Sequence, residues 1–357
     1  MSLRISQDAP ETLRDDGWHN AFTDLTWWRG QLWCAFRRAV THGITPPGTI
    51  QILAGSPTAT DWTLRHELTL PQTDLRDPRF LSTPDALYCL LGAYHPRPGA
   101  RCLSSNAAEN TIQTYVTWTR DGHQWAPVHP ILRPNYWGWS SILVSRRGQQ
   151  TLLYVAAYHT GMTHTETSSI VLFVGYGYTT LVPVATIYDG ANHATDEAPH
   201  YRPAEPVLFR TASGALGCCV RSEGSMDLGI GRFPYQAADW RWQDTRRLMH
   251  PSATITSPYG TLLVGRHVPP PQRATRDAAS PQVGLWRLMG RGAEPLARFP
   301  SYGDCAYAGL VAMPEPDTYL LSYYTQAPAN IRTLLTPEAA AVQLLQFRLT
   351  DDGLLLI

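Results

Sequence analysis

Residues 117–125 read TWTRDGHQW, a strand-like run followed by a tight turn and a tryptophan. Asp121 and Gly122 are residue types that close hairpins, because aspartate accepts hydrogen bonds from nearby backbone amides and glycine tolerates a positive φ. Trp125 can then pack into the strands beneath the turn. This S/T-x-D-G-x-x-W pattern predicts a hairpin of two antiparallel strands, and weaker versions occur at residues 56–62 and 237–240.

The same order of features recurs along the whole chain. A polar or glycine-containing turn precedes an apolar alternating run, a second turn and run follow, and a tryptophan or aromatic residue closes the unit. The spacing of about 45 to 65 residues, with room for four short strands in each unit, is typical of propeller blades. The sequence therefore predicts an all-β, six-bladed β-propeller that forms a single domain over residues 1–357, with units starting near residues 19, 74, 136, 205, 252 and 305.

Composition favours strands over helices. The chain contains 12 Trp, 17 Tyr, 27 Gly and 29 Pro, residue types enriched in strands and tight turns. Only residues 337–347, PEAAAVQLLQF, are compatible with a helix, and their alternation fits a closing strand equally well. The proline-rich stretch 269–282 is too short for a domain linker, and we expect a loop over the face that holds the site.

The charges exclude several classes of partner. With 29 basic and 29 acidic residues, no overall field favours nucleic acid or an anionic membrane surface. No apolar run is long enough for a signal peptide or a membrane span, so we expect a cytoplasmic protein. The six cysteines are at positions 34, 89, 102, 218, 219 and 305, and they form neither a C-x-x-C pair nor the spacing of a zinc site. We therefore expect reduced thiols in the core, and we expect no metal or organic cofactor.

Four polar residues stand at the edges of runs that otherwise look like core strands. Glu205, Arg221, Arg266 and Tyr307 each begin or end such a run. A carboxylate, two guanidiniums and a phenol are more chemistry than a β-scaffold needs for its stability. Because propeller strands converge on an axis, we expect these side chains to meet in one pocket.

Several phrases resemble the sialidase superfamily, and in particular bacterial BNR-repeat sialidase-like proteins. They are F-R-x-x-x-x-H at residues 36–42, D-L-R-D-P at 74–78, a glutamate sixteen residues before an arginine, and G-D-x-x-Y-x-G at 303–309. The residue 119–125 pattern is the Asp box of that superfamily. The resemblance covers nearly the whole chain and implies a sialidase-like retaining glycoside hydrolase. It also implies the site roles, with Tyr307 as nucleophile, Glu205 as its base, and Arg221 and Arg266 as carboxylate ligands.

The chain departs from the family pattern at its N-terminal end. His19 or Asn20 stands where the family has its first arginine, and the loop AVTHGITPPG contains no carboxylate where the family has its acid. Candidates for the missing cation are Arg37 and Arg76. Candidates for the acid are Asp77, His42 and Asp24, since a histidine or a carboxyl group can transfer a proton near neutral pH. Asp304, in the last phrase, joins the predicted substrate-binding residues.

The expected substrate is an acidic glycan or sugar acid, such as sialic acid or a related ulosonic acid. A carboxylate on the sugar would repel a carboxylate nucleophile, whereas a neutral tyrosine avoids that repulsion and arginines bind the carboxylate through paired hydrogen bonds. Two alternatives stay open: a carbohydrate-binding propeller without catalysis, and a hydrolase or lyase for another acidic sugar such as a uronic acid. Trp137 and Trp139 could stack on sugar or pack the blades.

Overall fold

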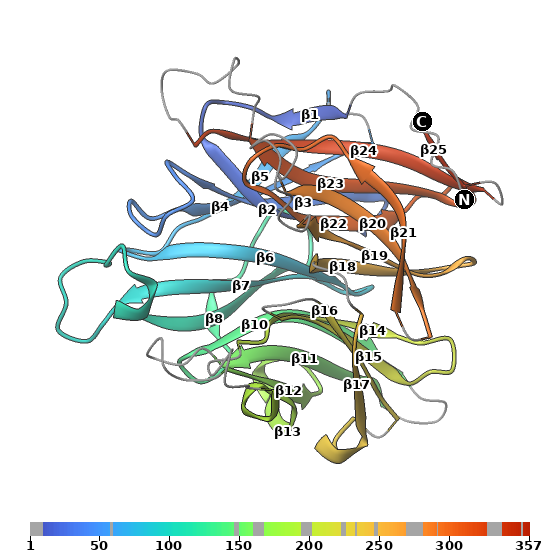
Figure 1. The fold of residues 1–357 in the computed structure, drawn as a ribbon. Coiled ribbons are helices and arrows are strands. Elements are labelled where there is room, and N and C mark those ends of the chain that lie inside the picture. Colours follow the sequence, from blue (N-terminus) through green and yellow to red (C-terminus); the bar gives the residue numbers. More distant parts are fainter. Residues whose placement is uncertain are drawn as a thin grey trace, which may run out of the picture.

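The fold is an all-β propeller (Figure 1). The computed structural model describes residues 10–57, 60–145, 150–159, 168–193, 202–222, 226–232, 234–245, 249–268, 281–290, 292–326, 338–350 and 353–357. Within them the strands form four four-stranded sheets and one nine-stranded sheet. Many strands are buried on both faces and not on one alone, since successive residues point to opposite faces and all of residues 305–311 and 318–325, for example, are buried.

The four-stranded sheets are antiparallel and follow the chain in order. The first contains β6 (Asp74–Ser82), β7 (Leu87–Pro96), β8 (Asn110–Thr119) and β9 (His129–Pro130). The second contains β10 (Tyr136–Val144), β11 (Leu152–His159), β12 (Ser169–Gly175) and β13 (Val182–Asp189). The third contains β14 (Ala204–Arg210), β15 (Leu216–Arg221), β16 (Met226–Gly231) and β17 (Trp240–Asp244). The fourth contains β18 (Met249–Ser257), β19 (Gly260–His267), β20 (Gln282–Met289) and β21 (Gly292–Phe299).

The nine-stranded sheet joins the two ends of the chain. One half contains β2 (His19–Trp28), β3 (Gln31–Ala39), β4 (Thr49–Gly55) and β5 (Thr63–Leu68), and the other contains β22 (Cys305–Ala312), β23 (Thr318–Gln326) and β24 (Ala340–Thr350). A single parallel pair, His19 with Ala340, connects the halves. Two further strands, β1 (Glu11–Arg14) and β25 (Gly353–Leu356), also pair with β24, and Figure 1 shows β1 beside it.

The sequence predicts six blades, whereas the described residues form four four-stranded sheets and one nine-stranded sheet, because the pairing of β2 with β24 merges two of the expected units. The predicted starts of the units agree closely with the first strands of the sheets, which begin at residues 19, 74, 136, 204, 249 and 305. Residues 340–347 lie in strand β24, so the strand interpretation of that segment is confirmed. The predicted loop at 269–282 lies, apart from its last two residues, outside the described residues.

The turn at 119–125 closes the hairpin as its sequence predicts. Asp121 accepts hydrogen bonds from the amides of His123 and Gln124, and Gly122 has a φ of 81°. Trp125 also contacts the neighbouring sheet. Its ring stacks on His66 of β5 and contacts the edge of Trp33 of β3, so it links this sheet to the neighbouring one.

Among the described residues, four short 3-10 turns connect the strands. The turns are η1 (Ala107–Glu109), η2 (Tyr178–Thr180), η3 (Gly190–His193) and η4 (Ala237–Asp239). No helix in the described segments is long and apolar enough to cross a membrane. Five of the cysteines are buried free thiols, as predicted, but the prediction is wrong for Cys102, which is exposed.

The first strand of each unit carries a β-bulge at the same place. These strands contact one another in the closed order β2, β6, β10, β14, β18, β22 and back to β2. In each of them the pairing with the next strand skips one or two residues, namely Phe22–Thr23, Asp77–Pro78, Trp139, Glu205–Pro206, Ser252 and Tyr307–Ala308. A bulge re-aims a side chain, so this ring of strands presents a ring of bulged residues at its centre.

Candidate active site

Bulged residues from two sheets meet around one carboxylate. Glu205 Oε1 accepts a hydrogen bond of 2.5 Å from the Tyr307 hydroxyl and one of 2.6 Å from Arg221 Nη1. Strand β15 brings Arg221 there because it lies opposite Ala204, next to the bulge of β14. The structure thus brings together three of the predicted site residues. Glu205 Oε2 is buried without a partner among the described residues, which leaves an acceptor for a ligand or water.

The surroundings keep Glu205 ionised and Tyr307 protonated. Burial raises the pKa of Glu205, but the charges of Arg221 and His250 and the hydrogen bond from Tyr307 together hold it below its ordinary value. Burial and the charge of Glu205 raise the pKa of Tyr307 well above its ordinary value. Glu205 is therefore the base to which Tyr307 can most readily release its proton.

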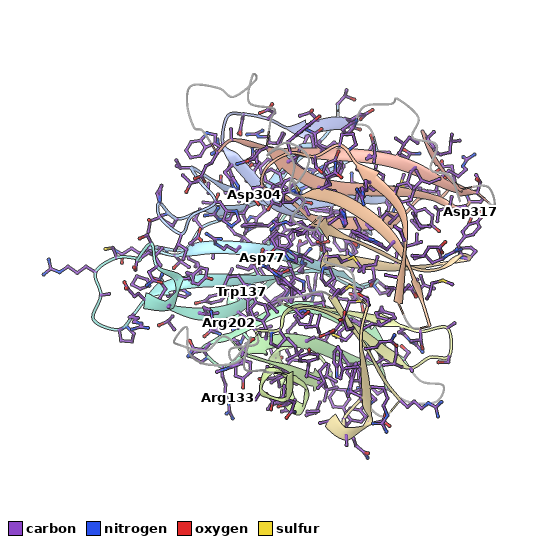
Figure 2. All side chains as sticks on the ribbon, in the orientation of Figure 1. Asp77, Arg133, Trp137, Arg202, Asp304 and Asp317 are labelled. Carbon is purple, nitrogen blue, oxygen red and sulfur yellow. The ribbon has the colours of Figure 1, made fainter. Side chains whose placement is uncertain are left out.

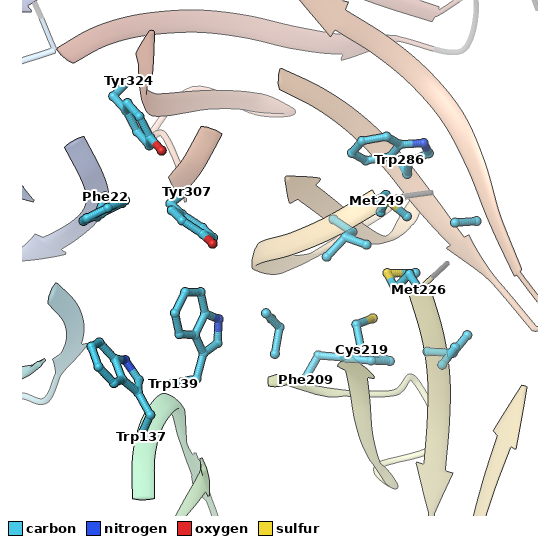
Figure 3. Packing of buried hydrophobic residues seen from close by; sticks show 14 of the residues in the cluster. Phe22, Trp137, Trp139, Phe209, Cys219, Met226, Met249, Trp286, Tyr307 and Tyr324 are labelled. Carbon is cyan, nitrogen blue, oxygen red and sulfur yellow. The ribbon is translucent and has the colours of Figure 1, made fainter. Parts of the chain in front are cut away.

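Aromatic packing fixes the tyrosine ring. The ring centroids of Phe22 and Trp139 lie 5.4 and 5.3 Å from that of Tyr307, both edge-on, and the Arg266 guanidinium lies 5.2 Å above its face. Figure 3 shows these rings and Tyr324 gathering from different sheets. Trp139 therefore contacts the proposed nucleophile directly, whereas its neighbour Trp137 packs against Tyr94 and Tyr158.

Arg266 is held by protein groups at the side of the pocket. Its Nε donates to the Cys305 carbonyl at 2.8 Å, and Nη2 donates to Asp304 Oδ1 at 3.1 Å and to the Tyr324 hydroxyl at 3.2 Å. Burial lowers the pKa of Arg266, but the electrostatic effects of Tyr324, Tyr307 and Asp304 outweigh burial and raise the pKa above its ordinary value, so the group stays charged. Its Nη1 makes no hydrogen bond with the described residues and is available to a ligand.

Asp304 contacts both predicted histidines. Its Oδ2 lies 3.1 Å from His19 Nε2 and 2.5 Å from His42 Nδ1, while Oδ1 accepts from Arg266 and from Tyr324. Burial raises the pKa of Asp304, but hydrogen bonds from the two histidines and the charge of Arg266 hold it well below its usual range. Asp304 was predicted to bind substrate, yet both of its oxygens are occupied by protein groups, so it orients other side chains.

Arg37 and Arg76 do not face an open pocket as the substrate-binding prediction requires. Arg37 is fully buried, and all three of its nitrogens bind Asp74 or the carbonyls of residues 41 and 43. Arg76 binds Asp74 at 2.5 Å and donates 2.7 Å bonds to the carbonyls of His42 and Gly43. The guanidiniums therefore bind the backbone of one loop, because the buried Asp74 carboxylate draws both of them to it. This corrects the prediction for Arg37 outright.

The acid candidates occupy different places. Asp77 lies at the bulge of β6, is buried, and makes no hydrogen bond with the described residues. Burial raises its pKa to about 6 against the opposing charges of Arg79 and Arg76, and Glu205 raises it further. Asp24 lies beyond the bulge of β2 and accepts from the Phe80 amide at 2.6 Å, away from Glu205. Asp77 thus interacts electrostatically with Glu205, whereas Asp24 is hydrogen-bonded to the backbone of β6.

Asn20 also lies away from the pocket, because its side-chain amide donates to Asp16 at 2.8 Å.

Sequence reasoning missed Phe22, Tyr324 and His250, which line the same centre. The sequence could have identified Phe22, because an alignment of the repeated units places AFT (residues 21–23) on the same position as RDP (76–78), AEP (204–206) and AYA (306–308). Figure 2 shows Asp77, Trp137 and Asp304 where the sheets meet, in contrast to the peripheral Arg133 and Asp317.

Three of these residues could in principle hold a metal ion. One ligand atom each from His19, His42 and Asp304 lies within 4.8 Å of the others. The charge of Arg266 already balances that of Asp304. Burial lowers the pKa of His19, Asp304 opposes this effect, and the charge of Arg37 lowers the pKa further. Neighbouring guanidiniums oppose a divalent cation, so the cluster is better suited to hydrogen bonding and proton transfer.

No protein-family model matches the sequence, and no curated protein is similar enough in sequence to match it. Solved structures do resemble the fold. A protein of unknown function from Dyadobacter fermentans superposes with a TM-score of 0.71 at 16% identity, over 96% of this chain and 98% of its own. An α-L-arabinanase from Penicillium chrysogenum, complexed with arabinobiose, gives 0.62 at 14% identity, over 95% of this chain and 98% of its own.

A sialidase from Trypanosoma rangeli, in complex with the inhibitor DANA, superposes with a TM-score of 0.61 at 10% identity. The match covers 92% of this chain but only 54% of the sialidase chain, so this chain corresponds to about half of that protein. At these identities the likeness establishes the fold, a sialidase-like β-propeller that arabinanases share.

Proposed function

We propose that this chain is a retaining glycoside hydrolase that acts on a sugar bearing a carboxylate, with its site on the propeller axis. The observation that carries the proposal is the bond between Tyr307 and Glu205, with Arg221 on the same carboxylate oxygen. A phenol bonded to an ionised, buried base is an activated nucleophile. Its neutrality suits attack beside a sugar carboxylate, where an anionic nucleophile would be repelled.

The mechanism has two steps. In the first, the Tyr307 oxygen bonds to the anomeric carbon while its proton passes to Glu205, and the bond to the leaving oxygen breaks as that oxygen takes a proton from an acid. In the second, water attacks the glycosyl-tyrosine, loses its proton to the same acid, and the tyrosine oxygen recovers its proton from Glu205. Two displacements retain the configuration.

Two arginines support the choice of an acidic sugar. The Arg221 side chain is 36% exposed and uses only Nη1 to bind Glu205, so Nε and Nη2 can reach a ligand. Arg266, above the Tyr307 ring, keeps Nη1 free of the described residues. Guanidinium groups on the two sides of Tyr307 would bind a carboxylate on the carbon that Tyr307 attacks.

We infer that the propeller has six blades and forms one domain. The nine-stranded sheet would contribute two of them, one built from β2 to β5 and one from β22 to β24 with β1 and β25. The closed ring of six first strands, each with a bulge at the same position, supports this count. The site then draws its residues from most of the blades.

A neutral glycoside is the second candidate substrate. The opposite pKa shifts of Asp77, raised to about 6, and Glu205, lowered, are what a pair of acid and nucleophile carboxyl groups needs. In that reaction Glu205 itself attacks and Tyr307 only orients it. The arabinanase, similar over its whole length, makes an α-L-arabinofuranoside the substrate to test.

Hydrolysis of 4-methylumbelliferyl glycosides tests these proposals. The panel contains an α-sialoside, a β-glucuronide and an α-L-arabinofuranoside. Turnover of an acidic glycoside that falls by about a thousandfold or more in Tyr307→Phe supports the tyrosine mechanism. Tyr323→Phe is the matched control, because Tyr323 on the same sheet donates to the Pro300 carbonyl instead.

Other outcomes are equally informative. Turnover of the arabinofuranoside that survives Tyr307→Phe but is lost in Glu205→Gln supports the two-carboxylate candidate. Binding of the sugars without any turnover contradicts both and leaves a carbohydrate-binding propeller. A lyase would need a 4-linked uronic acid, because elimination removes the proton on C5 and breaks the bond between C4 and its oxygen substituent. Formation of an unsaturated uronic acid from a 4-linked uronic acid disaccharide would therefore identify a lyase in place of the hydrolase that we propose.

A further inference from the structure

His42 is held far more firmly than a half-exposed loop residue needs for stability. Its amide donates to Glu338 Oε2 at 2.7 Å, its carbonyl accepts from Arg76 Nη2 at 2.7 Å, and its Nδ1 lies 2.5 Å from Asp304 Oδ2. These partners come from three places far apart in the chain. Even so, 47% of the side chain is exposed. A side chain fixed at every point except one edge is pre-organised for contact with a ligand.

The support extends to the whole loop. Arg37 and Arg76 together bind three successive carbonyls, those of Thr41, His42 and Gly43. Both arginines are anchored on the buried carboxylate of Asp74, which also accepts from the Gly48 amide at 2.7 Å. Burying two charges to hold a short loop is costly, and the loop presents only one ionisable side chain, that of His42.

The imidazole of His42 lies next to Phe22, which also contacts Tyr307. Nδ1 of His42 is hydrogen-bonded to Asp304, whereas Nε2 makes no hydrogen bond with the described residues. The His42 ring meets Phe22 edge-on with centroids 5.3 Å apart, and Tyr307 meets the same ring edge-on at 5.4 Å. Imidazole and phenol are therefore both in contact with one phenylalanine.

We propose that His42, oriented by Asp304, is the acid that protonates the leaving group and the base that later activates water. This rests on the proposed glycosidase function. Nε2 gives its proton to the glycosidic oxygen as that oxygen takes the electron pair of the breaking bond to the anomeric carbon. In the second step Nε2 takes a proton from the attacking water as the new bond to that carbon forms. The ring returns to its starting state.

Asp304 is the positioning residue. Its Oδ1 is held by Arg266 at 3.1 Å and by Tyr324 at 3.0 Å, so the carboxylate cannot turn away from His42. With Nδ1–H directed at Oδ2, the imidazole keeps Nε2 for a ligand, and the carboxylate fixes the tautomer and the orientation of the ring. Asp77 differs because it is buried beside Glu205, where it would contact the sugar ring.

A leaving-group comparison tests the assignment. The probes are 4-nitrophenyl and phenyl α-sialosides, because 4-nitrophenolate departs without protonation and phenolate needs a proton. We expect His42→Gln to lower kcat/KM for the phenyl glycoside by about a hundredfold or more and for the 4-nitrophenyl glycoside by less than about tenfold. Asp304→Asn should give the same pattern more weakly. His123→Gln, in the exposed turn at 119–125, is the matched control.

The contradicting results are distinct. If Asp77→Asn shows the leaving-group dependence and His42→Gln lowers both substrates equally, the acid is Asp77 and the proposal is overturned. If the wild-type protein cleaves neither glycoside, the proposed function fails together with this inference. His42→Gly supplies a second readout, since added imidazole should restore cleavage of the phenyl glycoside, and a lack of rescue in a folded variant counts against the assignment.

Discussion

Asp77 combines burial, a strained backbone and the absence of a hydrogen-bond partner among the described residues. Its φ is 50°, and Phe22, Glu205 and Tyr307 have similar values at the corresponding bulges. Residues other than glycine adopt positive φ at a cost of roughly 1 kcal/mol each. Strain that recurs at the residues lining one pocket is typical of a functional site.

Asp77→Asn should stabilise the protein at high pH. The pKa of Asp77 in the folded protein is about 6, above the ordinary 3.8, so the folded protein loses stability as pH rises between these values. The difference corresponds to about 3 kcal/mol, which the neutral asparagine would recover at pH 8 and not at pH 3.5. Urea unfolding at the two pH values measures it. An equal effect at both would show that ionisation of Asp77 is not the cause.

Arg221→Gln should move the acidic limb of the pH profile. Burial raises the pKa of Glu205 and Arg221 opposes that rise, so without the guanidinium the pKa increases and the base is protonated at higher pH. We expect the limb of kcat/KM to shift upward by about one pH unit or more. The exposed Arg210, at the other end of β14, supplies the control variant Arg210→Gln, whose profile should match the wild type.

At the scale of single residues, the sequence predicted which side chains lie together but not which hydrogen bonds connect them. Residue types, strand ends and the family resemblance selected Glu205, Arg221, Arg266 and Tyr307, which do lie together. The partners of Arg37 could not be predicted, because its bonds to Asp74 and to loop carbonyls depend on how two separate sheets pack. His19 and Asp304 meet across 285 positions of the chain, a separation that no local pattern reports.

The loop of residues 40–48 is a feature of the element scale. Its conformation depends on Asp74, which lies at the start of β6 and accepts from Arg37, Arg76 and the Gly48 amide. Strand β6 of one sheet thus determines the shape of a loop between β3 and β4 of another. The sequence placed these strands correctly, but it did not show that the DLRDP phrase supports a loop.

Asp74→Ala should destabilise the protein by about 3 to 5 kcal/mol, because it leaves two buried guanidiniums without their shared carboxylate. Urea unfolding measures the change, and Asp85→Ala, in an exposed turn, serves as the control. Hydrogen exchange at residues 41–43 should increase in the same variant. A change below about 1 kcal/mol would mean that Asp74 does not hold the loop.

At the scale of the whole molecule, β1 closes the ring by pairing with β24. Thr12 lies opposite Gln343, and their side chains are 3.1 Å apart. The sequence predicted the repeated units but not this pairing, since β1 precedes the first unit and has no pattern of its own. Closure between distant segments constrains the unfolded chain strongly when it is made covalent.

A disulfide between Thr12→Cys and Gln343→Cys should therefore stabilise the protein by about 3 kcal/mol. The exposed Cys102 is replaced by serine in the same background to prevent exchange. Thermal unfolding in the oxidised and reduced states gives the difference. If oxidation forms the bond but leaves Tm unchanged, the ends of the chain do not limit stability.

The closure also has a consequence for synthesis on the ribosome. His19 leaves the exit tunnel early, whereas Asp304 and Ala340, its partners across the closing seam, are translated near the end. Strand β2 must remain without its final neighbour until then. A chain terminated before residue 304 would contain His42 and Glu205 but neither the carboxylate that orients the one nor the phenol bonded to the other. Products truncated before residue 304 would therefore lack both the proposed nucleophile and the residue that positions the proposed acid, however many of their sheets had folded.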